Sequence, residues 1–109
     1  MPARLTSDFW VSAYVRRCHH EGAFALIRRR GAAEAGAILI VVDRLDGAND
    51  LYAPAPQTEL DDTRGRVFER IAEAVDGLTV EERIARELKF DSDLWIVAVE
   101  DRQGRAFLD

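Results

Sequence analysis

The residues with the most evident chemical potential are four neighbours, Cys18, His19, His20 and Glu21. Thiolate, imidazole and carboxylate groups are the usual protein ligands of zinc and iron. Neighbouring residues of a helix point about 100° apart, so at most two of these side chains could share one ion. No paired cysteines and no HExxH pattern complete a ligand set. We therefore predict no metal and no cofactor. If the protein is a small enzyme or ligand-binding domain, these histidines, Glu21 and Asp46 are its candidate acid–base groups.

Five arginines, Arg16, Arg17, Arg28, Arg29 and Arg30, carry the most concentrated positive charge of the chain. Guanidinium groups bind carboxylate and phosphate through paired hydrogen bonds, so this set is the candidate anion-binding site. The whole chain nevertheless has a formal net charge of -5. General nucleic-acid binding depends on clustered positive charge, so we do not expect nucleic acid to be the main partner.

Two glycines, Gly31 and Gly36, have the spacing found in a phosphate-binding loop. Ala37 and Ile38 stand where such a loop needs lysine and serine or threonine, and a strand pattern follows instead of a helix. A hairpin turn in which the glycines adopt positive φ explains the segment better.

Residues 51–57 contain two prolines, each of which holds the preceding residue in an extended conformation. Such a segment could present Tyr52 to a partner. Proline cannot donate to a strand ladder, so the same segment can instead be a short edge strand, or one that stops at Pro54. Tyr52, Pro54 and Pro56 are therefore candidate interaction residues, with a rigid exit from an edge strand as the alternative.

The elements that must position these residues begin with two amphipathic helices. Residues 8–21 follow Ser7, which is a favourable N-cap residue. A second helix is predicted over residues 80–88, because Thr79 and Glu82 have the spacing of a capping box. The residues of this second helix that are expected to face the core are Val80, Ile84 and Leu88.

Apolar runs predict the strands. Residues 23–30 and 37–42 are expected to pair through a hairpin at 31–36, with the second strand central and buried on both faces. Another strand is expected over residues 94–99, after which a polar turn would fold residues 106–108 back beside it.

Residues 67–75 fit both a helical and a strand pattern, and both assignments remain open. Residues 57–65 are predicted to be a polar acidic loop. Connections of hairpin length favour antiparallel pairing. We therefore predict an α+β fold, in which a mostly antiparallel sheet of about four to six strands has two or three helices packed on one face.

Length and composition are those of one globular domain. The chain has 109 residues, of which 48% are apolar and 32% charged, so we expect a single domain over residues 1–109. The first residues lack the apolar core of a signal peptide, and no apolar run is long enough to span a membrane, so no membrane partner is expected. The single cysteine excludes an intramolecular disulfide and agrees with a cytoplasmic location.

Several segments together resemble a small bacterial family. They are Phe-Trp-Val-Ser-Ala-Tyr at 9–14, Arg-Arg-Gly at 29–31 followed by Glu-Ala-Gly-Ala at 34–37, Arg-Leu-Asp-Gly at 44–47, Leu-Tyr-Ala-Pro-Ala-Pro-Gln at 51–57 and Phe-Asp-Ser-Asp-Leu-Trp-Ile-Val at 90–97. With these segments the chain resembles domain of unknown function 1491 over nearly its whole length. The resemblance implies a self-contained bacterial single-domain protein and transfers no catalytic residue.

Three functions follow as hypotheses. The leading one is a small non-enzymatic interaction module that contacts another protein, or itself as a homodimer, through an exposed sheet edge or the proline segment. The first alternative is a small enzyme or ligand-binding domain with its site near the end of the first helix. The second is an anion or nucleic-acid binder that uses the five arginines.

Overall fold

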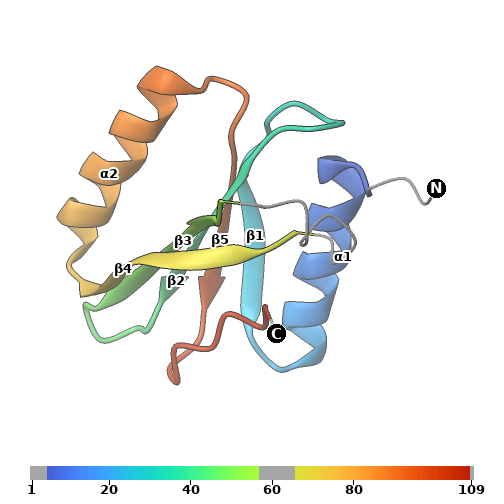
Figure 1. Ribbon diagram of the computed structural model, residues 1–109. Helices are drawn as coiled ribbons and strands as arrows, with labels where there is room; N and C mark the ends of the chain where they lie inside the picture. Colours follow the sequence, from blue (N-terminus) through green and yellow to red (C-terminus); the bar gives the residue numbers. More distant parts are fainter. Residues whose placement is uncertain (1–4, 57–65, 109) are drawn as a thin grey trace.

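The computed structural model describes residues 5–56 and 66–108. These residues form two helices and five strands. In chain order they are α1 (Ser7–His20), β1 (Phe24–Arg29), β2 (Ile38–Asp43), β3 (Asn49–Pro54), β4 (Phe68–Val75), α2 (Gly77–Phe90) and β5 (Trp95–Glu100) (Figure 1). The segment left open between helix and strand is therefore strand β4. The predicted polar loop at 57–65 lies outside the described residues.

Both helices begin at a cap other than the predicted one. The Thr6 side chain caps α1 by accepting from the Phe9 amide at 3.2 Å. Ser7, the predicted cap, is instead buried and donates its hydroxyl to the Gly36 carbonyl. In α2 the Asp76 carboxylate accepts from the Thr79 amide at 2.7 Å, so the helix starts earlier than the predicted capping box. Asp76 lies three residues before Thr79, the spacing at which an N-cap side chain accepts from a helix amide. Asp76 is therefore the N-cap, and Thr79 lies in the first turn of the helix.

The five strands form one sheet with the order β1-β5-β2-β3-β4. β5 runs parallel to β2 and antiparallel to β1, and the other two pairs are antiparallel. The prediction of an α+β fold with a mostly antiparallel sheet is confirmed, and β2 is the middle strand as expected. β3 is not an edge strand, because β4 pairs with its outer side as far as Pro54, where the strand ends.

The loop between β1 and β2 is not a hairpin, because β5 lies between these two strands. The loop crosses the start of β5, where the Ala32 amide donates to the Asp93 carbonyl at 3.0 Å. A Cβ atom on Gly31 or Gly36 would lie 2.1 or 2.5 Å from that carbonyl oxygen. Neither glycine has positive φ. Close approach of two main chains, rather than the predicted turn conformation, therefore requires glycine here.

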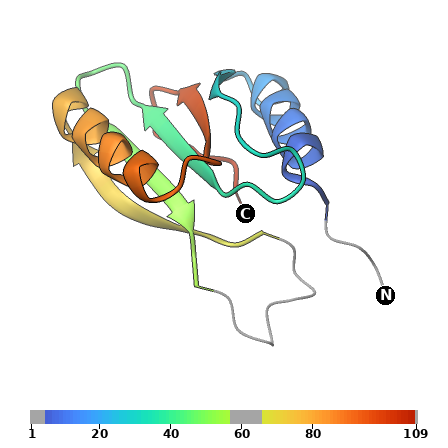
Figure 2. The ribbon, with the colours of Figure 1, turned by 90° about the horizontal axis from the view of Figure 1, so that it is seen from above.

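The two helices cover opposite faces of the sheet, as seen from above in Figure 2. This corrects the prediction that the helices pack on one face. The reason is that the central strands are apolar on both sides: Ile40 and Val97 belong to the core beside α1, whereas Leu39 and Ile96 belong to the core beside α2. Val80, Ile84 and Leu88 face the sheet from α2, as the sequence pattern predicted.

Residues 106–108 do not form the predicted strand. Both sides of β5 are already paired, so no ladder position beside it remains. After a turn clamped by Asp101 and Arg105, the chain instead packs against α1, where the Tyr14 hydroxyl donates to the Ala106 carbonyl at 2.6 Å. In the described part of the chain, neither helix has the length and apolar character needed to cross a membrane.

Candidate functional site

Among the described residues, the free edge of β1 combines exposed apolar side chains with an unpaired main chain. β1 ends the strand order, so one side of its main chain has no strand neighbour. Phe24 and Leu26, on the face of the sheet opposite α1, are 53% and 42% exposed. Ala25 and Ile27 alternate with them and pack into the core beside α1. We call Phe24, Leu26 and the free main chain of residues 24–27 the β1 edge surface.

The position of α2 explains why this surface is open. α2 packs mainly over β3 and β4 (Figure 2), and it reaches β1 at the ion pair between Glu81 and Arg28. The nearest strand, β5, offers little cover, because Leu26 lies beside Ala98 and Phe24 beside the exposed Glu100. Two large apolar side chains are therefore left at the margin of an otherwise covered sheet. Apolar residues beside an unpaired strand are the usual template for adding another strand.

His19 contacts this edge from the end of α1. Its Nε2 atom lies 2.9 Å from the Ala25 carbonyl oxygen, to which it can donate, and its ring centroid is 6.2 Å from that of Phe24. Alternate residues of an edge strand direct both main-chain groups away from the sheet. The His19 contact indicates that Ala25 belongs to this outward set, and Ile27 follows it by the two-residue period. His19 therefore marks which main-chain groups face outward.

The arginines at the end of β1 all have partners. Arg28 forms an ion pair with Glu81 of α2, and Arg29 donates to the Leu94 carbonyl at 2.7 Å. Arg30 lies 3.6 Å from Asp8 and over the ring of Trp95. Arg16 and Arg17 are exposed on α1. The predicted anion set is therefore split between a helix and a strand, and its strand members are engaged with separate groups.

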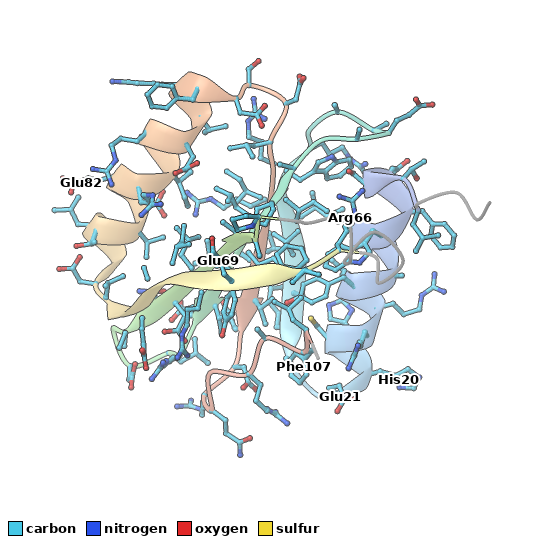
Figure 3. The ribbon with its side chains drawn as sticks, viewed as in Figure 1. His20, Glu21, Arg66, Glu69, Glu82 and Phe107 are labelled. Atoms are coloured by element: carbon cyan, nitrogen blue, oxygen red, sulfur yellow. The ribbon has the colours of Figure 1, made fainter. Side chains whose placement is uncertain are left out.

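The cluster from Cys18 to Glu21 is dispersed by the helix. Cys18 is fully buried beside Tyr14, and burial raises the pKa of its thiol, which keeps it protonated and unreactive. His20 and Glu21 point away from the body of the protein in Figure 3. Asp46 lies in the loop after β2, where its carboxylate accepts from the Ala48 amide. Within residues 5–56 and 66–108, no three His, Cys, Asp or Glu side chains are placed to hold a metal ion.

The proline segment borders a small cavity. Tyr52 is half-buried against the core beside α1, whereas Pro54 and Pro56 are exposed. Pro54 lines an open cavity of about 180 Å³ together with Arg66 and Phe68. Ligand-binding pockets usually occupy about 300 Å³ or more, so this cavity is small for an organic substrate. The segment stays a candidate contact, but its aromatic residue faces inward.

Among the described residues, two buried carboxylates, Asp50 and Asp101, have structural partners. Asp50 is fully buried, and its oxygens accept from Arg44 Nε and Nη2 at 3.0 and 2.8 Å and from the Ala74 amide at 2.8 Å. Asp101 accepts from the Arg105 side chain, and this hydrogen bond lowers the pKa of Asp101. Both oxygens of each carboxylate already accept hydrogen bonds, from an arginine side chain and from a main-chain amide. Neither is poised for acid–base catalysis.

The sequence did not single out Phe24 and Leu26. The predicted hairpin would have paired their strand with residues 37–42, so nothing marked them as residues of a free edge. Their exposure depends on the insertion of β5 and on the face that α2 covers, and no local pattern reports either. The one available signal is the arginine run that follows them, since charged residues often protect sheet margins.

Comparisons with known proteins identify a matching family and similar solved structures. A family model described as "Protein of unknown function (DUF1491)" matches residues 5–109. The solution structure of protein Atu0922 from A. tumefaciens is similar, with 41% identity, a TM-score of 0.81 and coverage of 90% of this chain and 86% of that one. A crystal structure of a DUF1491 family protein from Caulobacter crescentus has 34% identity, a TM-score of 0.80 and coverage of 97% and 94%. The search of curated proteins produced no match.

Proposed function

The chain belongs to the DUF1491 family, as its resemblance implied, and from its own surface we propose that it is a small non-enzymatic protein-interaction module that binds through the β1 edge surface. The observation that carries this proposal is the exposure of Phe24 and Leu26 beside a strand without an outer neighbour. Main-chain groups of a free edge supply affinity, and alternate side chains supply specificity, when an extended segment adds to a sheet.

The two alternatives have weaker support. A site near the end of α1 would need reactive groups that converge, whereas Cys18 is enclosed and His20 and Glu21 point outward. An anion or nucleic-acid site would need arginines that converge on one ligand, whereas Arg28 and Arg29 have separate partners. The net charge of -5 also disfavours nucleic acid.

The cytoplasm remains the proposed location. The one cysteine, Cys18, is buried and forms no disulfide, which suits a reducing compartment. The proposed partner is a protein, either another chain or a second copy of this one, and the proposal includes no cofactor.

The proposal can be tested by comparing three immobilised baits in an extract of a bacterium that encodes a family member. The baits are the unaltered protein, Leu26→Lys and Leu45→Lys. Leu45 is a matched control because it has the same 42% exposure but lies in the loop after β2. We expect proteins retained by the first and third baits to be lost with Leu26→Lys, as measured by quantitative mass spectrometry.

Two results of that comparison would count against the proposal. Retention of the same proteins by all three baits would place binding elsewhere on the molecule. Loss of the retained proteins after nuclease treatment would instead favour the arginine alternative, because capture would then depend on nucleic acid.

A further inference from the structure

We propose that the partner of the β1 edge surface is a second copy of this chain, with the two β1 strands antiparallel across a twofold axis at Leu26. The two five-stranded sheets then become one continuous sheet. This inference rests on the proposed interaction function and names its partner.

Main-chain geometry selects the register. Ala25 and Ile27 direct their main-chain groups outward, as the His19 contact with the Ala25 carbonyl indicates. An axis at Leu26 places Ala25 opposite the partner's Ile27, and such a pair exchanges two hydrogen bonds. The Ala25 carbonyl can accept from both His19 and the partner, because a carbonyl oxygen has two lone pairs. The β1–β5 ladder is regular from Phe24 to Ile27 and shifts between Ile27 and Arg29, so the edge is straight where Ala25 and Ile27 would pair.

Side chains on the open face match in the same register. Leu26 lies opposite the partner's Leu26, which covers both apolar side chains. Phe24 lies opposite the partner's Arg28, whose aliphatic stem can cover the ring while its guanidinium keeps the ion pair with Glu81 of its own chain. The contact therefore covers the two exposed apolar residues of β1 in each copy.

Charge complementarity favours a second copy in the antiparallel direction. One end of β1 carries Arg28, Arg29 and Arg30, of which Arg30 is the most exposed and has only a 3.6 Å contact with Asp8 as an ion pair. The other end lies beside two exposed acids, Glu21 and Glu100. Antiparallel pairing puts the basic end of each strand beside the acidic end of the other. Parallel pairing would put arginines against arginines. The strand is thus complementary to itself in one direction only.

No strand among the described residues pairs with the outer side of β1. α1 lies beside β1 in Figure 2, and His19 reaches the edge from it, so the partner strand must pair next to this side chain. A contact through one short strand is small beside the roughly 800 Å² per partner of stable interfaces. We therefore expect a dimer whose population rises with protein concentration rather than a permanent one.

The first experiment measures mass by sedimentation equilibrium over roughly a hundredfold range of protein concentration. The unaltered protein and Leu45→Lys should shift from monomer towards dimer, and Leu26→Lys should remain monomeric. A monomer throughout would overturn self-pairing, as would a dimer that Leu26→Lys leaves unchanged.

The second experiment tests the register by disulfide trapping. Opposed residues of an antiparallel pair have Cβ atoms about 4.5–5.5 Å apart, close to the distance that a disulfide spans. Leu26→Cys should therefore form a covalent dimer under mild oxidation, while Leu45→Cys should not. Cys18 is buried and can stay in place in both variants. Equal crosslinking of the two variants would reject the register.

A charge exchange tests complementarity with a rescue. Arg30→Glu should weaken the dimer, because it places an acid near the partner's Glu21. Adding Glu21→Arg should restore dimerisation, since opposite charges then face each other again. A double variant weaker than the single variant would contradict the antiparallel arrangement. Circular dichroism of both variants confirms that each is folded.

These results separate the inference from the function on which it rests. A monomer in every experiment, with extract proteins still lost only from the Leu26→Lys bait, would reject the second copy and keep the interaction module. If position 26 affects neither self-association nor capture, both proposals fail.

Discussion

The two outer strands of the sheet, β1 and β4, have opposite surface chemistry. β1 presents Phe24 and Leu26 along a ladder that is regular from Phe24 to Ile27 and has one register shift, between Ile27 and Arg29. β4 presents Glu69, Arg70 and Glu73, and its pairing with β3 contains two register shifts. Charged side chains and irregular pairing are the usual means of preventing another strand from adding to an edge. The contrast supports the proposal that another strand adds at β1 rather than at β4.

The two edges also differ in how they are fixed. The end of β4 depends on a buried carboxylate, since Asp50 binds both Arg44 and the Ala74 amide, and Ala74 has a positive φ of 54°. The end of β1 depends on close main-chain contact at Gly31. The end of β4 is thus fixed by the hydrogen bonds of a buried carboxylate, and the end of β1 by close packing of two main chains. Different substitutions can therefore disturb each end on its own.

Asp50→Ala should give the largest effect, because it removes the anchor of β4. We expect the free energy of unfolding to fall by about 3–5 kcal/mol, since Arg44 and the Ala74 amide lose their acceptor. Urea denaturation measures the change. Asp46→Ala, which removes an exposed carboxylate in the loop between β2 and β3, should cost about 1 kcal/mol or less. Equal losses in the two variants would contradict the anchoring role.

Gly31→Ala should give the second-largest loss of stability, because it disturbs the end of β1. The new Cβ atom would lie 2.1 Å from the Asp93 carbonyl oxygen, so the main chain must shift. We expect a loss of about 1–3 kcal/mol in the free energy of unfolding, as for other overpacked sites. Gly77→Ala is the matched control, because no atom lies within 4 Å of its Cβ position. A loss no larger than that of the control would show that close main-chain contact at Gly31 does not fix the end of β1.

Asp76→Ala should lower the thermal midpoint of the protein by an amount that depends on pH. Asp76 caps α2, the helix that packs over β3 and β4. The hydrogen bond from the Thr79 amide lowers the pKa of Asp76 below its ordinary 3.8. Because the folded-state pKa is the lower one, the stabilisation is complete above about pH 3.8 and is lost as the pH falls through the folded value. Thermal melts followed by circular dichroism should show a larger difference from the unaltered protein at neutral pH than in strong acid.

Asp76→Asn is the control for that experiment. Its side-chain oxygen can still accept from the Thr79 amide, so it should keep much of the cap and lose the pH dependence. A difference between Asp76→Ala and the unaltered protein that stays constant with pH would rule out the ionised cap.

Glu69→Leu should have the smallest effect on stability and yet remove the contrast between the edges. Glu69 is exposed on β4 (Figure 3), so the free energy of unfolding should change by about 0.5 kcal/mol or less. An apolar residue in place of the charge should permit new association through β4, seen as a concentration-dependent mass by light scattering. If this variant associates no more than the unaltered protein, charge is not what protects β4.

Much of the fold could be predicted from local patterns. The spacing of Val80, Ile84 and Leu88 predicted the buried side of α2, and the apolar run at residues 37–42 predicted a central strand. These succeeded because side-chain period and burial are linked within one element. The caps at Thr6 and Asp76 were each missed in favour of a nearby hydroxyl residue that suited the same position.

The candidate site could not be predicted in the same way. The sequence by itself determined that residues 24–27 belong to a strand, which was predicted over residues 23–30. Only the tertiary structure decided that β5 pairs between β1 and β2, that the helices take opposite faces, and that Phe24 and Leu26 stay uncovered. The physical reason is that strand order depends on contacts between distant segments, whose energies no local pattern of side chains contains.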